Sequence, residues 1–280
     1  MAGPNLARRT VRMMVFRGEY LRLRTERDLT DAKIKAAGVD PSGIWRWLNG
    51  ETRRPRRSTV ELLLNVLRPP ESLRAELLDL ALNPEGPGWV RAYEGVLPDT
   101  VTTYSGFEAE AERVRNWEPA NVPGLLQTAA YTEAVIRAVP GVTDVHVARQ
   151  LDVRRRRQAV LTATPPLHLH AVLGEAVLHQ VVGTPATTKQ QLLALGKQPE
   201  NVTVQVVPFS LTHPGGTGSF VLMDFRDPRA AAAAVVESPA GLNFVDSDER
   251  LGRIWDRLAS LALSPQDSAA YIAAAAKKMK

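Results

Sequence analysis

The sequence lacks cysteine altogether, which excludes disulfide bonds, thiolate metal sites and a cysteine nucleophile. It also lacks long apolar runs: stretches such as 230–236 are far shorter than the about 20 residues that cross a bilayer. Near the start, Arg8 and Arg9 stand where a secretion signal would have its apolar core. We therefore expect no membrane span and no secretion signal, and a protein of the reducing cytoplasm.

Charge of both signs is present, but it is unevenly distributed. Residues 1–68 hold 15 Lys and Arg against 7 Asp and Glu, a net charge of +8, whereas the remainder holds 20 against 23, a net charge of −3. A cationic segment attracts polyanions such as nucleic acid, although it can also be a solvated helical surface. The composition, 44% hydrophobic and 23% charged, is that of an ordinary globular protein, and 280 residues favour two domains.

The cationic segment has the pattern of a small all-helical domain. Thr30 and Asp31 are suited to cap a second helix, and Gly38 can supply the positive φ at its end. Asp40 and Pro41 then begin a third helix, which ends near residue 49. An apolar core face is predicted from Tyr20, Leu23, Ile34, Val39, Ile44, Trp47 and Leu48, and two further helices from residues 59–67 and 71–82.

The second and third of these helices have the arrangement of a helix-turn-helix, in which the outer face of the second motif helix enters the major groove of DNA. Ile44 and Trp47 would face inward, which leaves Arg46 outside as the residue able to form two hydrogen bonds with guanine. The arginines that follow would neutralise phosphates, unless the domain is an adaptor with merely solvated arginines. The predicted DNA-binding residues are Ser42, Gly43, Trp45, Arg46, Arg53, Arg54, Arg56 and Arg57.

At these residues the segment resembles the Xre-type helix-turn-helix, the repressor-like module of many bacterial regulators. It departs from that pattern in three places. Asp31 stands where a glutamine or another long polar donor is usual, Lys35 stands where a small residue is usual, and one residue is missing before Gly38. Asp31 would repel phosphate, so these departures leave room for a protein that has kept the fold without operator recognition.

The rest of the chain reads as helices followed by strands and closing helices, which predicts an α+β domain with a small sheet and flanking helices. The predicted domains are a helix-turn-helix domain over 1–83, a linker and connecting segment over 84–103, and the α+β domain over 104–280. Helices are predicted over 104–117, 125–139, 249–263 and 265–278, and strands over 167–173, 202–207, 220–225 and 233–237.

A second resemblance is carried by the string Val-Pro-Gly-Leu-Leu-Gln-Thr at 122–128, with Trp117-Glu118-Pro119 before it and Tyr131 after it. Roughly residues 100–270 are similar to the antitoxin-like domain of unknown function that follows the helix-turn-helix in a large actinobacterial, Streptomyces-type regulator family. This resemblance implies a transcriptional regulator, of a kind often encoded beside a small partner protein.

Polar residues of the second domain are candidates for a ligand cleft. Glu175 is expected where a strand passes into a helix, and His179, four residues on, shares its helical face. The alternative is that Glu175 only stabilises a helix N-terminus and that the arginines before it form an exposed helix face. The candidate ligand-pocket residues are Trp117, Gln127, Arg154, Arg157, Gln158, Glu175, His179 and His213.

No catalytic residue, cofactor or metal is assigned. His168 and His170 share one face of a predicted strand, but two histidines without a third ligand do not predict a metal site. The glycine-rich loop 212–218 lacks the lysine of a phosphate-binding loop.

The predicted function is therefore an Xre-type transcriptional regulator, cytoplasmic and homodimeric, whose C-terminal domain senses a ligand or a partner. The expected partners are double-stranded DNA, a small-molecule effector and a small protein encoded nearby. The alternative is a biosynthetic enzyme or small-molecule-binding protein with its cleft in the C-terminal domain, and a third interpretation is a scaffold acting only through its partner protein.

Overall fold

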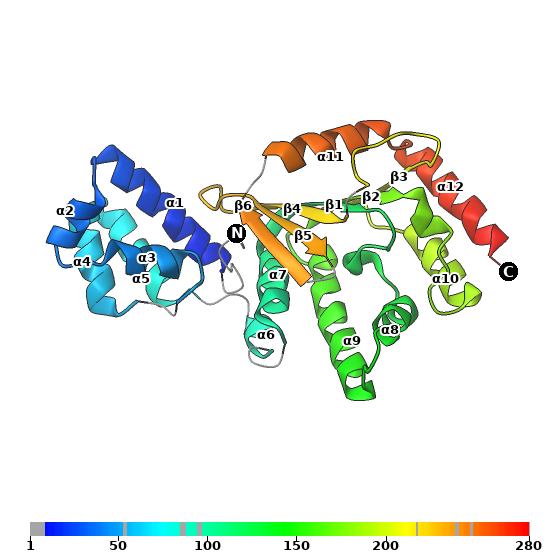
Figure 1. Ribbon diagram of the computed structural model, residues 1–280, viewed down its shortest axis with the longest axis horizontal. Helices are drawn as coiled ribbons and strands as arrows, with labels where there is room; N and C mark the ends of the chain where they lie inside the picture. Colours follow the sequence, from blue (N-terminus) through cyan, green and yellow to red (C-terminus); the bar gives the residue numbers. More distant parts are fainter. Residues whose placement is uncertain are drawn as a thin grey trace. The chain divides into compact units, whose positions relative to one another are not determined.

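The computed structural model describes residues 9–52, 55–84, 88–93, 97–216, 218–238, 241–246 and 249–279. It consists of a helical N-terminal region followed by an α+β domain with a six-stranded sheet (Figure 1). By its internal contacts the chain divides into two units. The first unit comprises Met1–Ala111, Asp224–Ala233 and Gly241–Ser247, and the second comprises Glu112–Met223, Ala234–Ala240 and Asp248–Lys280.

The second and third helices of the first unit begin where their capping residues predict. The Thr30 hydroxyl accepts a hydrogen bond from the Lys33 N–H, and the Asp40 carboxylate accepts from the Ser42 N–H, so each side chain satisfies a backbone donor left open at a helix start. Gly38 has a φ of 83°, as the turn requires. The helices are α1 (Val11–Glu26), α2 (Asp31–Ala36), α3 (Pro41–Leu48), α4 (Arg57–Leu67) and α5 (Glu71–Leu82).

These helices share one apolar core. Trp47 of α3 is 2% exposed, and its ring meets that of Phe16 of α1 edge to face with 5.0 Å between centroids. The predicted core face is confirmed, because all seven of its residues are buried: Tyr20, Leu23, Ile34, Val39, Ile44, Trp47 and Leu48. Each such side chain contributes about 1.5–3 kcal/mol by leaving water, which holds short helices that would be unstable alone.

Further elements complete the first unit: α6 (Gly88–Arg91), α7 (Asp99–Glu110) and β6 (Gly241–Asp246). Phe107 of α7 packs edge to face on Phe225 and Phe244, with ring centroids 5.4 and 5.7 Å apart. A strand over 241–246 was not predicted from the sequence.

The sheet has the strand order β3-β2-β1-β4-β5-β6. In the second unit, β1 and β2 are parallel, with Trp117 opposite Val172, and β2 and β3 are parallel as well. All three strands therefore end at the same edge of the sheet. The strands are β1 (Ala111–Glu118), β2 (His168–Gly174), β3 (Val202–Val207), β4 (Phe220–Phe225) and β5 (Ala233–Ser238).

The prediction of one helix over 104–117 is wrong in its second half. The helix α7 ends at Glu110, and β1 begins directly at Ala111. Ala111, Val114 and Trp117 are three residues apart, a spacing that fits a helix face, but pairing with β2 decides the conformation. The strands predicted over 167–173, 202–207, 220–225 and 233–237 are confirmed to within a residue at each end.

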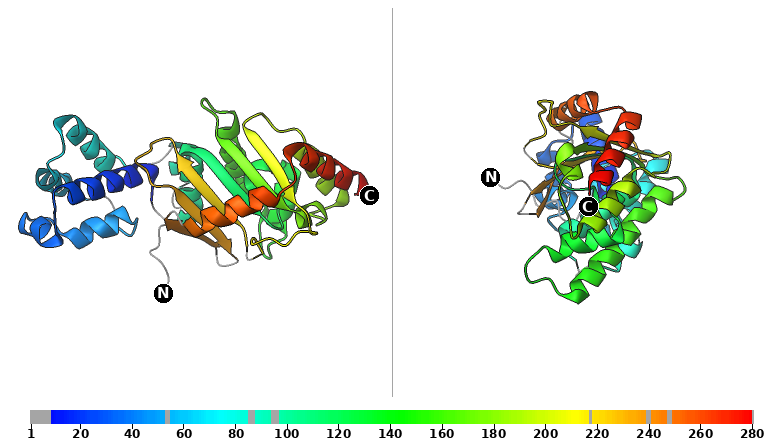
Figure 2. Two further views of the ribbon diagram at one scale, coloured as in Figure 1. Left: turned by 90° about the horizontal axis from the view of Figure 1, so that it is seen from above. Right: turned by 90° about the vertical axis from the view of Figure 1, so that its right-hand side faces the viewer.

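Helices cover the sheet in the second unit (Figures 1 and 2). Trp255 and Leu258 of α11 pack on a cluster that includes Trp117, Val172 and Phe220. The predicted helix over 125–139 starts later, after the short turn η1, and α10 was not predicted. The helices and 3₁₀ turns are η1 (Gly124–Leu126), α8 (Ala129–Arg137), α9 (Asp144–Gln158), η2 (Ala159–Thr162), η3 (Glu175–Leu178), α10 (Pro185–Leu195), α11 (Glu249–Leu261) and α12 (Pro265–Lys278).

Candidate functional site

The α2–α3 pair displays a short cationic and aromatic surface. Ile44 and Trp47 point into the core, as expected for the inner face of a recognition helix. On the outer face Ser42 and Arg46 are exposed, Trp45 is 46% exposed and Gly43 is half-buried. An exposed tryptophan offers a large apolar area to a partner, so the outer face of α3 is a part of the first unit suited to binding.

Charged neighbours shape this surface. The Arg46 guanidinium lies 4.0 Å from the Asp40 carboxylate, a long and exposed ion pair that is weak in water. Arg17 of α1 lies over the Trp45 ring, 5.1 Å from its centroid, and adds a second basic side chain that the sequence did not single out. Only the packing of α1 on α3 brings Arg17 to this place, so no local signal could have identified it.

The other predicted DNA-binding residues follow α3 in the chain. Arg56 is exposed just before α4, and Arg57, also exposed, pairs with Glu61 at 2.8 Å. Arg53 and Arg54 lie outside the described residues. The structure thus shows two exposed basic side chains of this run, and either could reach a phosphate.

Asp31, which departs from the Xre pattern, is not an isolated negative charge. Its carboxylate forms an ion pair with Arg24 of α1 at 2.6 Å, and Arg24 also donates to the Leu29 carbonyl. This pairing offsets the repulsion that an aspartate at the start of α2 would exert on a phosphate.

In the second unit, the loop after β1 is built around Gly124. A Cβ at this position would lie 1.6 Å from Nη1 of Arg154, so any other residue would displace that guanidinium, whereas Nη2 of Arg157, at 3.5 Å, would be in ordinary contact. The Gln158 side chain donates to the carbonyls of Gly124 and Gln127, at 3.3 and 2.6 Å. Four predicted pocket residues, Gln127, Arg154, Arg157 and Gln158, are therefore brought together here.

Two hollows adjoin this loop. One, of about 390 Å³, is lined by Gln127, Arg154 and Glu118, and the other, of about 370 Å³ between α8 and α9, by Gln127, Arg154 and Gln158. Glu118 is the last residue of β1, and the sequence did not identify it as a pocket residue. Burial raises its pKa to about 8, and the negative charge of Glu237 acts in the same direction.

Glu175 and His179 form a separate group at the ends of β2 and β3. The Glu175 carboxylate accepts from the Phe209 N–H and the Tyr271 hydroxyl, both at 2.7 Å, and lies 3.1 Å from Nε2 of His179. These hydrogen bonds lower the pKa of Glu175 despite its desolvation. The His179 ring stacks on Phe209, which is 65% exposed. The residues that bond Glu175 are thus different from those around Gly124.

Trp117 and His213 form a third group. Trp117 is fully buried in the core, and its indole N–H donates to the Gly215 carbonyl at 2.9 Å. The His213 ring packs edge to face on Trp117, and its Nδ1 accepts from the Gly215 N–H. The glycine-rich loop is held against the core here, since a Cβ on Gly215 would lie 2.5 Å from the indole.

The two strand histidines have different surroundings. His168 is exposed, whereas the half-buried His170 contacts Gln205 at 2.6 Å and packs edge to face on Trp255. Desolvation lowers the pKa of His170, which favours its neutral form.

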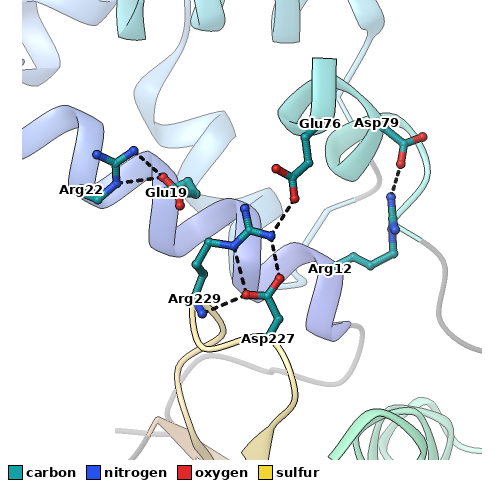
Figure 3. Close-up of polar contacts among 7 residues, drawn as sticks. All are labelled: Arg12, Glu19, Arg22, Glu76, Asp79, Asp227 and Arg229. Carbon is teal, nitrogen blue, oxygen red and sulfur yellow. Dashed lines mark hydrogen bonds and ion pairs between the residues drawn. The ribbon is translucent and has the colours of Figure 1, made fainter. Parts of the chain in front are cut away.

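A last polar group in the first unit joins the β4–β5 turn to helices α1 and α5 (Figure 3). Arg229 binds the carboxylates of Glu76 and Asp227, at 2.6 and 2.7 Å. Its hydrogen bonds lower the pKa of both acids. The backbone comes close as well, because a Cβ on Gly18 would lie 2.5 Å from the Arg229 carbonyl oxygen.

Known protein families match both regions of the chain. A helix-turn-helix domain family matches residues 18–77, and a family described as a domain of unknown function (DUF5753) matches residues 101–274, more than half of the chain. No curated protein and no solved structure matches the chain. Within the described ranges, no helix combines the length and the apolarity that crossing a bilayer requires.

Proposed function

The chain belongs to the DUF5753 family, and from that premise we propose that it is a DNA-binding regulator of transcription whose C-terminal domain senses a small molecule or a partner protein. The regulator is of the Xre type, acts in the cytoplasm where DNA is available, and binds as a homodimer to two half-sites. The match of a helix-turn-helix family to residues 18–77 supports the DNA-binding part of this proposal.

The observation that carries the proposal is the outer face of α3. Arg46 and Trp45 are exposed there, although the same helix buries Ile44 and Trp47. In a helix-turn-helix, this outer face meets base edges, where an arginine can bind guanine through two hydrogen bonds. Arg56 and Arg57 would contact the DNA backbone and set the register of the helix in the groove.

The test is a fluorescence anisotropy titration of the full chain with DNA from upstream of its gene. We expect the affinity to fall on the order of a hundredfold between 50 and 200 mM salt, because phosphate contacts release counterions. Arg46→Ala should weaken binding by about 1–3 kcal/mol at one sequence and relax specificity. Arg56→Ala should weaken binding to all sequences alike and reduce the salt slope by about one.

The matched control is Arg149→Ala, which removes an exposed arginine from α9 in the second unit. This variant should bind DNA like the unmodified chain. Equal, salt-insensitive affinities for all four proteins would contradict the proposal and favour an enzyme or small-molecule-binding protein with a regulator fold.

A further inference from the structure

A polar cavity lies in the second unit at the carboxyl end of β1. Its volume is about 390 Å³, within the roughly 300–1,000 Å³ of small-molecule pockets. Glu118, the last residue of β1, lines this cavity. Ser219, just before β4, and Glu237, near the end of β5, line it as well. In the sheet order, β1 has β2 on one side and β4 on the other. The end of β1 and the start of β4 therefore meet at this cavity, and a concave polar site of this size suits a small molecule.

The loop after β1 forms another wall of the cavity. Asn121, Gly124 and Gln127 line it, and all three belong to or adjoin the string at 122–128 that carries the family resemblance. The Gln127 side chain is held in place, since it donates to the Val122 carbonyl at 2.8 Å and accepts from the Thr132 hydroxyl at 3.1 Å. This wall is therefore preformed, and a ligand would not have to order it.

The charges around the cavity are unbalanced. Two carboxyl groups, Glu118 and Glu237, face one guanidinium, Arg154, whose neighbours include Gly124. Among the residues that line the cavity, ionisation of both carboxyl groups would leave one more negative charge than positive, and of these two groups Glu118 is half-buried and Glu237 is exposed. Low dielectric surroundings make such a charge costly, and a cation of the right size removes the cost.

We propose that this cavity binds a small polar molecule carrying one ammonium group, which the Glu118 and Glu237 carboxylates receive while Asn121 and Ser219 offer hydrogen bonds. This ligand would be the effector of the proposed regulator, and to that extent the inference rests on the proposed function. Its binding to the chain, however, is measured without DNA.

The chemistry implies an exchange of a proton for the ligand. Because the pKa of Glu118 is raised to about 8, this carboxyl group is mostly protonated in the empty cavity at neutral pH. The ammonium group displaces that proton to solvent, and Glu118 becomes a carboxylate. The groups that act on Glu118 are Glu237, which raises its pKa, and Arg154 and Asn116, which lower it. Burial raises the pKa of the Tyr131 hydroxyl on α8, and the Glu118 carboxylate acts in the same direction.

The experiment uses the full chain and ligand-observed NMR titrations with three probes. Glucamine and sorbitol have the same carbon chain but differ in one group, an ammonium in place of a hydroxyl, and ethanolamine is a minimal amine that fits a cavity of any shape. We expect the amines to bind at least about tenfold more tightly than sorbitol at pH 8. Amine affinity should rise about tenfold or more from pH 6 to pH 8, as Glu118 gives up its proton.

Two variants decide whether the cavity is responsible. Glu118→Gln keeps the shape of the protonated side chain, so it should fold, lose at least about tenfold in amine affinity and lose the pH dependence. Glu133→Gln is the control, because Glu133 is a glutamate of α8 that pairs with Arg137 outside the cavity. Equal binding of glucamine and sorbitol, failure of both amines to bind, or unchanged binding to Glu118→Gln would each overturn the proposal. None of these results depends on whether the chain binds DNA, so the two proposals fail separately.

Discussion

The α3 surface and the β1 cavity present charge in opposite ways. On α3, Arg46 and Trp45 stand on the outside of a short helix, where a large partner can approach. At the end of β1, Glu118 lies in a cavity that admits only a small molecule, and burial changes its pKa. An exposed convex surface suits a macromolecule, whereas a concave polar site suits a small one. Under the two proposals above, one unit would bind DNA and the other a small molecule.

The largest expected effect comes from a substitution in the core beneath the α3 surface. Trp47→Ala should lower the free energy of unfolding of the N-terminal helices by about 3–5 kcal/mol, because Trp47 is 2% exposed and supports α3 from within. Thermal unfolding followed by circular dichroism measures the loss. DNA binding should disappear, while amine binding at the β1 cavity should persist.

Trp47→Phe is the matched variant for that prediction. Among the described residues the buried Trp47 Nε1 has no hydrogen-bond partner, so phenylalanine gives up ring area but no hydrogen bond. We expect it to be destabilised far less than Trp47→Ala. If Trp47→Phe were as unstable as Trp47→Ala, a smaller buried aromatic ring would not be enough to stabilise α3, and the full indole ring would be required.

The second prediction concerns Gly124, which lines the β1 cavity. Gly124→Val puts a Cβ where Nη1 of Arg154 would be 1.6 Å away, so the guanidinium must leave its place. Because Nη1 is the far end of a flexible side chain, we expect a loss of only about 1 kcal/mol in unfolding free energy. Amine binding should weaken because Gly124 lines the cavity and the valine side chain takes up space there, with DNA affinity unchanged. Calorimetric unfolding and the NMR titration measure the two effects. Gly106→Val is the control for stability, since a Cβ there meets nothing within 4 Å.

The sequence predicts the helical region better than the sheet domain, and the reason is the range of the interactions. The start of α3 depends on Asp40, which bonds a backbone N–H two residues away. The conformation of Val114 depends on its pairing with Leu169, more than fifty residues further along the chain, and the periodicity around it resembles a helix.

The same reasoning applies to the candidate sites. Ser42, Trp45 and Arg46 come from one helix at spacings of three and four, so their common exposure follows from the helical repeat. The packing of Arg154 on Gly124, and the bond from Tyr271 to Glu175, join residues far apart in the chain. The sequence could nominate Arg154 and Glu175 as polar residues of interest, but only the fold shows that their neighbours differ. It also missed Glu118 as a pocket residue, because the prediction of a helix over 104–117 hid the strand that ends there.

The third prediction concerns the β4–β5 turn, whose strands continue along the chain to Ser219 and Glu237. Arg229→Ala should remove two ion pairs and lower the unfolding free energy by only about 0.5–1 kcal/mol, because both pairs are partly exposed. The pKa values of Glu76 and Asp227 are lowered in the folded chain, so this stability is present above about pH 4 and is lost as the pH falls through the lowered values. Urea unfolding at pH 7 and at pH 3 measures it.

Arg149→Ala is also the control for this stability measurement. The electrostatic explanation would be contradicted if the unfolding free energies of Arg229→Ala and the unmodified chain differed by the same amount at pH 3 as at pH 7. If an amine changes the DNA affinity of the unmodified chain, Arg229→Ala should reduce that change. The Arg229 contacts hold the turn against α1 and α5, and the hairpin is continuous with the cavity residues.

The smallest expected effect concerns Asp31, and it separates a working DNA surface from a degenerate one. Asp31→Gln restores the long polar donor of the Xre pattern and releases Arg24, whose guanidinium pairs with Asp31 at 2.6 Å. Removing one negative charge near the DNA backbone should raise affinity by a few fold and steepen the salt dependence slightly, since less repulsion opposes the phosphates. Anisotropy titrations at two salt concentrations measure it. Asp28→Asn is the matched control, because Asp28 is an exposed acid near the same helix that pairs with Lys33. If Asp31→Gln gains nothing beyond this control, then Arg24 already neutralises Asp31, and the departure from the pattern costs the α3 surface little.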